Sequence, residues 1–172
     1  GKYGDQTQQT SESLSCKACP AGRWSSTVGL GVAAGATACT ACTTGTYNDV
    51  ESQSINTCKN CAAGRYNDVT GIDAANNCKS CAAGKYNTAT GSSSSSACNF
   101  CAAGYAFDTT ATSCQACTGS TYQAQSNVAG VTCSPWSTCG AGNYETETPT
   151  ASRNRVCEEC ISGQYQDGAT FT

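Results

Sequence analysis

The spacing of the cysteines constrains this chain more than any other feature. Sixteen of its 172 residues are cysteine, and they form eight close pairs, seven of which are Cys-x-x-Cys. The pairs lie at residues 16 and 19, 39 and 42, 58 and 61, 78 and 81, 98 and 101, 114 and 117, 133 and 139, and 157 and 160. A spacing that recurs along the whole chain indicates a tandem array of small units.

The second cysteine of each pair opens a repeated phrase, as in CAAGRYNDV at 61–69 and CAAGKYNTAT at 81–90. A glycine usually follows at +3, where it permits a turn with positive φ beside a cross-link. An aromatic usually follows at +5, and we expect it to pack against the disulfide; a sugar- or ligand-binding stripe of aromatics is the alternative. The +3 glycines are Gly22, Gly45, Gly64, Gly84, Gly104, Gly142 and Gly163, and the +5 aromatics are Trp24, Tyr47, Tyr66, Tyr86, Tyr122, Tyr144 and Tyr165.

The composition leaves too little apolar material for an ordinary core. Leu, Ile, Val and Phe together make up 15 of the 172 residues, about 9%, whereas chains below roughly 20% are expected to be disordered. The net charge is only −3, so charge repulsion does not explain the shortage. Covalent cross-links are therefore expected to offset the backbone entropy of folding.

Cysteines in such pairs serve three kinds of chemistry: disulfides, zinc binding and redox reactions. Cys-x-x-Cys pairs separated by 15 or 16 residues also fit a zinc ribbon. However, the pairs continue as an even array, glycine lies at +3 rather than beside the second cysteine, and the chain has no histidine. A thioredoxin-like motif needs one such pair at the start of a helix. The pattern therefore favours disulfides and predicts no cofactor or metal.

The repeated phrase suggests a ladder in which each opening cysteine bonds the first cysteine of the next pair. The expected bonds are Cys19–Cys39, Cys42–Cys58, Cys61–Cys78, Cys81–Cys98, Cys101–Cys114, Cys117–Cys133 and Cys139–Cys157. Interleaved pairings remain an alternative, since the sequence does not exclude them.

Cys16 and Cys160 are left over by this ladder. The first residues, GKY, match the end of CAAGKY, so Cys16 is expected to close on a cysteine outside this sequence, as is Cys160. A Cys16–Cys160 bond, or bonds between neighbouring copies, is the alternative. The expected units are a truncated repeat at 1–16, repeats at 19–39, 42–58, 61–78 and 81–98, a short repeat at 101–114, a larger module at 117–157 and a truncated repeat at 160–172.

The expected fold class is small and disulfide-rich: an elongated tandem array of short β-hairpin and loop modules with no single core. Segments such as TYNDV at 46–50 are typical of a short strand ended by a turn, with Asn and Asp as turn formers. No helical periodicity of useful length occurs, and GSSSSS at 91–96 is interpreted as an exposed loop tip.

The phrases CPAGRW, CAAGRYNDV and CAAGKYNTATG resemble the ephrin-receptor-like cysteine-rich repeats of extracellular proteins. The segment CSPWSTCGAGNYETETPTASRNRVCEEC, within residues 117–160, resembles a tumour-necrosis-factor-receptor-type cysteine-rich module. The resemblance implies disulfide-laddered, EGF/TNFR-like modules in the extracellular space, and it says little about function. The short repeat and the displaced aromatics Tyr105 and Phe107 depart from the pattern and are expected to bend the array.

Several functional classes are disfavoured. With no histidine and with oxidised cysteines, a nucleophile would lack a base of near-neutral pKa, so we expect no enzyme. Asp49, Asp68 and Asp73 lack the ligand density of a calcium loop and are interpreted as solvated turn residues, as Glu158 and Glu159 are interpreted as surface charge. Nine scattered basic residues predict no nucleic-acid partner, and no apolar run is long enough for a membrane span. Trp136 is expected to pack within its own module.

These observations predict an extracellular, secreted or cell-surface scaffolding protein, a segment of a longer surface or filament-forming (fibril) protein. Its partners would be neighbouring copies, further repeats of the same chain and glycans. A ligand-binding receptor or adhesion ectodomain is the alternative, and a zinc-binding module a remote one. Thr and Ser cluster in the return legs, so O-glycosylation is predicted at Thr88, Thr90, Thr109, Thr110, Thr146 and Thr148.

Overall fold

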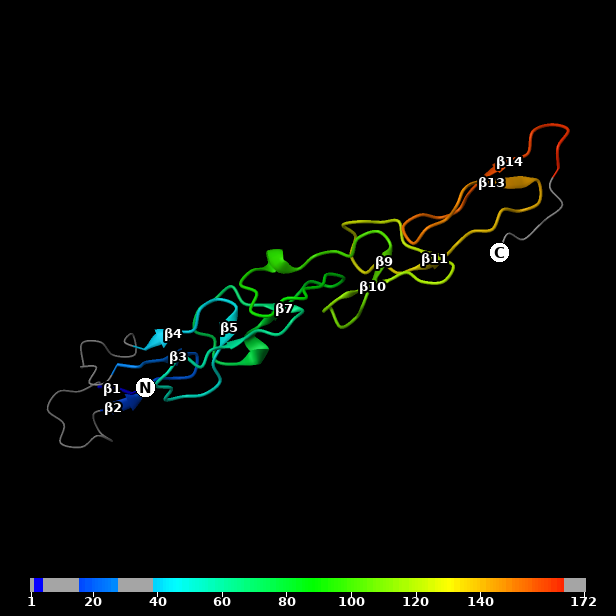
Figure 1. The fold of residues 1–172 in the computed structure, drawn as a ribbon. Coiled ribbons are helices and arrows are strands. Elements are labelled where there is room, and N and C mark those ends of the chain that lie inside the picture. The colour runs from blue at the N-terminus through cyan, green and yellow to red at the C-terminus, as the bar shows by residue number, and fades with distance from the viewer. Residues whose placement is uncertain (1, 5–15, 28–38, 166–172) are drawn as a thin grey trace. The chain divides into compact units, whose positions relative to one another are not determined.

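The computed structural model describes residues 2–4, 16–27 and 39–165. The described chain divides into two compact units, and the 81–98 repeat contributes to both. The first unit comprises Gly1–Cys81 and Asn87–Cys98, and the second comprises Ala82–Tyr86 and Asn99–Thr172. Each unit is a series of small antiparallel hairpins, which Figure 1 shows as short labelled arrows separated by loops.

The first unit contains four hairpins of two or three residues per strand. Their strands are β1 (Lys2–Gly4) with β2 (Cys16–Ala18), β3 (Arg23–Trp24) with β4 (Thr40–Ala41), β5 (Thr46–Tyr47) with β6 (Lys59–Asn60), and β7 (Arg65–Tyr66) with β8 (Lys79–Ser80). Lys2 pairs with Ala18 and Tyr3 with Lys17, in the register by which Arg23 pairs with Ala41 and Trp24 with Thr40. The strands β3, β5 and β7 each end at the +5 aromatic, after which the chain enters a loop.

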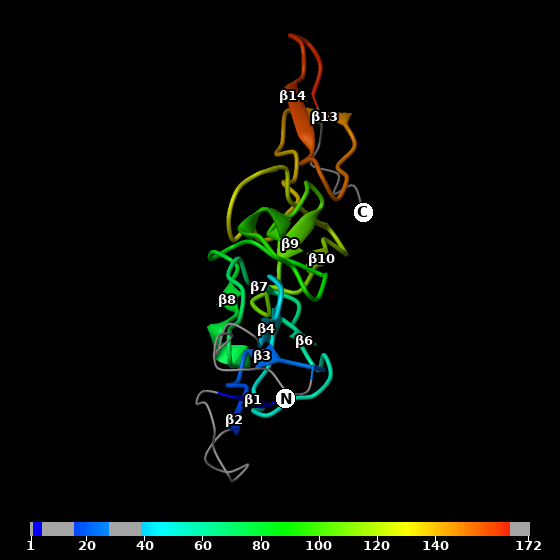
Figure 2. The same ribbon diagram turned by 90° about the vertical axis from the view of Figure 1, so that its left-hand side faces the viewer.

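In its described residues the second unit contains three hairpins and two isolated antiparallel bridges, Tyr86–Asn99 and Thr150–Arg153. Its strands are β9 (Tyr105–Phe107) with β10 (Cys114–Ala116), β11 (Thr121–Tyr122) with β12 (Ser134–Pro135), and β13 (Asn143–Glu147) with β14 (Val156–Glu159). The β13–β14 hairpin is the longest, and Figure 2 shows its two strands side by side. The register of this pair shifts between Glu145 and Glu147, as at a β-bulge.

The expected tandem array of disulfide-bonded hairpin modules, with little regular secondary structure and no single core, is confirmed. Among the described residues the helical elements are two 3-10 turns in return legs, η2 (Ala75–Asn77) and η3 (Ser95–Ala97). The most deeply buried side chains are cysteines and asparagines. The +5 aromatics of the described repeats are half-buried or exposed, up to 87% for Tyr165.

Seven disulfides join cysteines within the described part of the chain. They join Cys19–Cys39, Cys42–Cys58, Cys61–Cys78, Cys81–Cys98, Cys101–Cys114, Cys117–Cys133 and Cys139–Cys157. Their Cα–Cα distances run from 5.6 to 5.9 Å, within the usual range for a disulfide. Each bond joins the opening cysteine of a phrase to the first cysteine of the next pair, so each of the modules between Cys19 and Cys157 carries its own cross-link.

Candidate functional site: the module junctions

The clearest recurring arrangement is the junction between one module and the next. The +3 glycine N–H donates to the carbonyl of the residue at +6 in the following module. The donor–acceptor distances are 2.7 Å for Gly22 to Asn48, 2.7 Å for Gly45 to Asn67 and 2.8 Å for Gly64 to Asn87 in the first unit, and 2.7 Å for Gly104 to Gln123 in the second. The first contact between neighbouring modules is therefore a hydrogen bond between backbone atoms alone.

A second backbone bond leaves the +6 residue in the same direction. The N–H of Asn48 donates to Ile72 at 3.2 Å, and that of Asn67 donates to Ser92 at 2.9 Å. The same bond recurs at three other +6 positions: from Ser25 to Gln53 in the first unit, and from Phe107 to Val131 and Gln123 to Ala151 in the second. Each acceptor lies in the return leg of the following module, which is thereby held at two points.

The +3 glycines also lie against the module after next. A Cβ placed on Gly45 would lie 2.1 Å from the carbonyl oxygen of Gly91, and one on Gly22 would lie 2.2 Å from that of Gly71. In the second unit, a Cβ on Gly84 would lie 2.3 Å from the amide nitrogen of Gly130. Glycine is therefore required by the close approach of another backbone as well as by positive φ.

The return-leg glycine that makes this approach is also fixed. Gly71 N–H donates to the Cys42 carbonyl, and Gly91 N–H donates to the Cys61 carbonyl, both at 2.8 Å. GSSSSS is consequently only partly the exposed tip expected from sequence: Ser93, Ser94, Ser95 and Ser96 are exposed, whereas Gly91 lies in a junction.

Asparagine at +6 supplies the side-chain part of the junction. Asn48, Asn67 and Asn87 are buried, with exposed fractions of 0%, 1% and 3%. Each side-chain amide donates back to a carbonyl of the preceding module: Arg23 at 3.4 Å, Thr46 at 3.1 Å and Arg65 at 3.3 Å, respectively. Each side-chain oxygen accepts the N–H two residues later, from Val50, Val69 and Ala89. One side chain therefore fixes both its own turn and the module before it.

Replacing Asn67 with alanine should lower the free energy of unfolding by roughly 2–3 kcal/mol, because the variant leaves the Val69 N–H and the Thr46 carbonyl without their side-chain partner. Urea unfolding of the oxidised chain, followed by near-UV circular dichroism, measures the change. Asn76→Ala is the control, because Asn76 is exposed, and it should change stability by less than about 0.5 kcal/mol. Equal losses in the two variants would contradict the assigned role.

Gln123 occupies the +6 position in the second unit and departs from the pattern. Its side chain is 4% exposed, its amide donates to the Gln125 carbonyl at 2.8 Å, and its Oε1 is buried without a partner. The extra methylene of glutamine moves the oxygen past the turn N–H that an asparagine reaches. The junction here keeps its backbone bonds and loses the side-chain pattern.

We expect Gln123→Asn to stabilise the second unit by about 1 kcal/mol, since it removes a buried unsatisfied oxygen and allows the turn bond of the other repeats. Native-state hydrogen exchange of the Gly104 and residue 123 amides reports this unit directly. Faster exchange in the variant than in the parent chain would contradict this prediction. It would show that packing of the extra Gln123 methylene stabilises the unit more than the turn hydrogen bond of an asparagine does.

Lysine–aspartate pairs lie beside the aromatics of two repeats. Lys59 Nζ lies 2.6 Å from Asp49 and 5.9 Å from the centre of the Tyr47 ring. Lys79 lies 2.7 Å from Asp68 and 6.0 Å from the Tyr66 ring. The hydrogen bond from each lysine lowers the pKa of its aspartate, and the same bond raises the pKa of the lysine. Both pairs are exposed and add little stability.

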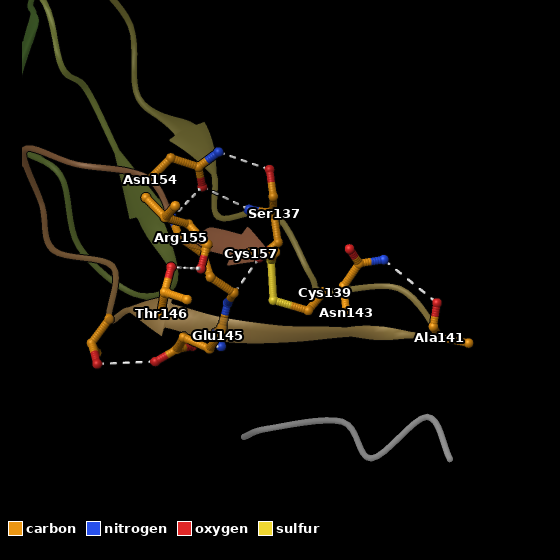
Figure 3. The surroundings of a disulfide bond; sticks show 11 residues. Ser137, Cys139, Ala141, Asn143, Glu145, Thr146, Asn154, Arg155 and Cys157 are labelled. Carbon is orange, nitrogen blue, oxygen red and sulfur yellow. Dashed lines mark hydrogen bonds and ion pairs between the residues drawn. A yellow bond between two sulfur atoms is a disulfide. The ribbon is translucent and has the colours of Figure 1, made fainter. Parts of the chain in front are cut away.

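The module closed by Cys139–Cys157 is held by a polar network instead of an asparagine junction (Figure 3). Glu145 takes the +6 position and forms an ion pair with Arg155, whose Nε donates to the Ser137 carbonyl at 3.0 Å. Asn154 bridges the same segment, accepting from Ser137 N–H at 2.8 Å and donating to Ser137 Oγ at 2.7 Å.

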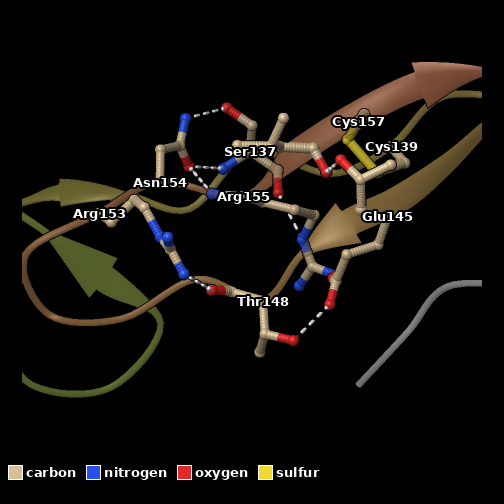
Figure 4. Close-up of polar contacts among 10 residues, drawn as sticks. Ser137, Cys139, Glu145, Thr148, Arg153, Asn154, Arg155 and Cys157 are labelled. Atoms are coloured by element: carbon tan, nitrogen blue, oxygen red, sulfur yellow. Dashed lines mark hydrogen bonds and ion pairs between the residues drawn. A yellow bond between two sulfur atoms is a disulfide. The ribbon is translucent and has the colours of Figure 1, made fainter.

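The network extends to the turn that joins the two strands of this hairpin (Figure 4). Thr148 Oγ1 donates to Glu145 Oε1 at 2.9 Å, and the Arg153 guanidinium donates to the Thr148 carbonyl at 3.4 Å and pairs with Glu147 at 2.7 Å. The +6 position thus carries a polar side chain here too, although the partners are charged.

The remaining predicted residues fall as follows. Cys160 is a half-buried free cysteine, while the side chain of Cys16 lies outside the described residues. Asp73 accepts from Asn77 at 2.6 Å, and Glu158 accepts from the Tyr144 hydroxyl at 3.4 Å. Trp136 is half-buried with its ring N–H unpartnered, and Glu159 is exposed. Thr88, Thr90, Thr109, Thr110, Thr146 and Thr148 are all exposed.

Across residues 2–4, 16–27 and 39–165, no group of three or more His, Cys, Asp or Glu is placed to hold a metal ion. In the same residues, no helix is long and apolar enough to cross a membrane.

The buried asparagines are the functional residues that sequence reasoning missed. The sequence predicts them as turn formers, and the side-chain oxygen of each accepts the N–H two residues later. Their burial is not predicted by the sequence. The available signal was the repetition of Tyr-Asn at +5 and +6 in three phrases, since a turn alone rarely needs the same residue each time.

No protein-family model matches this chain. No curated protein matches it either.

Proposed function

We propose that this chain is a non-enzymatic extracellular scaffold, a cysteine-rich spacer within a longer surface or filament-forming protein. The observation that carries the proposal is the repeated junction, in which backbone bonds from a +3 glycine or a +6 residue hold successive modules together within each of the two units. Modules that contact mainly their neighbours form arrays whose length grows with repeat number. Disulfides persist in oxidising compartments, which supports an extracellular location.

The resemblance to ephrin-receptor-like repeats and to a tumour-necrosis-factor-receptor-type module at 117–160 supports the same class. In the second of these segments the structure has the disulfides Cys117–Cys133 and Cys139–Cys157. The resemblance supports extracellular modules and leaves a ligand-binding ectodomain as the alternative function.

Immunoelectron microscopy of intact source cells and secreted material tests the proposal. A scaffold should be labelled repeatedly along extracellular coats or filaments. Labelling confined to the plasma membrane, with the protein in the detergent-soluble fraction, would favour the receptor. An intact mass that shows free thiols and stoichiometric zinc would reject both the scaffold and the receptor, and it would favour the zinc-binding module.

The elongated shape expected of such a spacer is also open to measurement. Small-angle scattering of the oxidised chain should give a radius of gyration well above about 16 Å, the value for a compact domain of this length. A value near 16 Å would mean that the modules fold back on one another, and the spacer would have to be abandoned.

We also propose O-glycans on the exposed threonines. Thr148 donates to Glu145 and Thr110 shares a bond with Thr112, so Thr88, Thr90 and Thr109 are the more accessible acceptors. Hexose-type mass increments on peptides from native material are expected there first. Unmodified peptides at all six threonines would reject this part of the proposal.

A further inference from the structure

A cavity of about 340 Å³ lies in the first unit, between the β5–β6 hairpin and the following module. Its lining residues are Tyr47, Asn60, Ala62, Arg65, Ala75, Asn76 and Cys78. Its volume lies at the lower end of the range for small-ligand sites, about 300–1,000 Å³. A single monosaccharide is therefore large enough to fill the cavity, and a longer oligosaccharide is not needed.

Arg65 is the charged residue of this lining. One of its Nη atoms donates to the Cys78 carbonyl at 2.8 Å, and no carboxylate of a described residue lies within 4 Å of its guanidinium. A guanidinium has five N–H donors in a planar fork that matches a carboxylate. The bond to Cys78 holds the group in place, and its remaining donors are unused by the described part of the chain.

The other polar lining side chains also have unused hydrogen-bonding capacity. The side chains of Asn60 and Asn76 and the Tyr47 hydroxyl make no hydrogen bond with any described residue. A primary amide both donates and accepts, as does a phenol, so these groups suit hydroxyls, which also do both. The apolar part of the lining is limited to Ala62, Ala75 and Cys78, which does not suit a large aliphatic group.

Two lysines are adjacent in sequence to lining residues, and neither adds an uncompensated charge to the site, since Lys79 pairs with Asp68. Lys59 lies over the Tyr47 ring, and it is neutralised by Asp49. The cavity therefore offers one uncompensated positive charge, which suits a monoanion better than a phosphate or a sulfate cluster. A monoanion with a planar carboxylate and several hydroxyls is a sugar acid.

We propose that this cavity binds a hexuronate unit. Arg65 pairs with the carboxylate, Asn60 and Asn76 bind the ring hydroxyls, and Tyr47 offers its hydroxyl and the edge of its ring. A cavity in the second unit provides a comparison within the same molecule: it is lined by Tyr122, Gln123 and eight other uncharged residues, so it has no group to bind the carboxylate.

The test is a titration of the ¹⁵N-labelled, oxidised chain with sodium glucuronate, followed by NMR. The side-chain amide signals of Asn60 and Asn76 and the Arg65 Nε–H signal should shift, while signals of Tyr122 and Gln125 in the second cavity should stay in place. Glucose, acetate and an acetylated glutamate amide form the other arms. Each lacks part of the recognised chemistry and should bind at least about tenfold more weakly.

Three variants complete the design. Arg65→Met should weaken glucuronate binding by about tenfold or more, as expected for the loss of a charged hydrogen-bond partner. Arg23→Met is the matched control, because Arg23 donates to the Cys39 carbonyl at 2.9 Å in the equivalent way and does not line the cavity. It should bind like the parent chain. Asn60→Ala tests the site without touching the Arg65 bond to Cys78, and it should also weaken binding.

Several results would overturn the proposal. They are the absence of any shift with glucuronate, parent-like glucuronate binding by both Arg65→Met and Asn60→Ala, or a loss of binding in the Arg23→Met control as large as that in Arg65→Met. Binding of the glutamate amide as tight as that of glucuronate would assign the cavity to an acidic peptide side chain and would reject the sugar acid.

Discussion

Replacing Gly45 with alanine should cost several kcal/mol, whereas the same change at Gly142 should cost about 1–2 kcal/mol. Both glycines stand at +3 after an opening cysteine, and both have a φ of +80°. They differ in their neighbours: the new Cβ would lie 2.1 Å from the Gly91 carbonyl oxygen at Gly45, and nothing lies within 4 Å of it at Gly142. The difference between the two costs therefore isolates the close approach between modules from the conformational cost.

Hydrogen exchange locates the damage. In Gly45→Ala, the amides of residue 45 and Gly91, which donate to Asn67 and Cys61, should lose protection. In Gly142→Ala, the Cys160 amide, which donates to the residue 142 carbonyl, should change much less. Similar costs for the two variants would mean that the glycines serve their own turns only and that the junction tolerates displacement.

Removing the Cys61–Cys78 disulfide is expected to have an effect of similar size. The bond closes a loop with a sequence separation of 17, and loops of this length are associated with about 3 kcal/mol of stabilisation. The Cys61→Ser/Cys78→Ser double variant should therefore unfold at clearly lower urea concentration. Since Cys61 and Cys78 are almost fully buried, their replacement also places two hydroxyls where sulfur packed.

Cys160→Ser provides the control for this experiment. Cys160 is a free cysteine within the described residues, so its replacement should leave the urea midpoint nearly unchanged. A double variant as stable as the parent chain would show that hydrogen-bonded junctions alone hold the module. Full reduction should unfold the chain, because only 15 of its 172 residues are Leu, Ile, Val or Phe.

The hairpin modules followed from the sequence because cysteine spacing acts locally. A cysteine, a glycine three residues later and an aromatic two residues after that place a turn and a strand before any long-range contact is known. The strand at Arg65–Tyr66 and its pairing with Lys79–Ser80 are of this kind.

The junctions did not follow, because they join backbone atoms. Every residue has a backbone carbonyl, so residue type does not indicate which carbonyl is contacted. The contact between Gly45 and Gly91 therefore could not be predicted from the sequence. The buried asparagines lay between these cases: Asn67 was correctly expected in a turn, but its burial depends on Thr46 of the preceding module. The Arg65 cavity was also beyond sequence reasoning, since it joins residues from two modules.

A junction made of backbone atoms has a consequence for how such a chain can evolve. Ser, Asp, Thr or Val at an exposed loop position contributes little to docking, so these positions are free to change. The +6 residue also varies, from Ser25 to Asn48 and Phe107, because its bond to the following module uses the backbone N–H. A duplicated module would bring with it the groups needed to dock on its copy. Repeats in this chain could therefore be gained or lost by unequal recombination without compensating mutations, and array length would be a readily heritable variable.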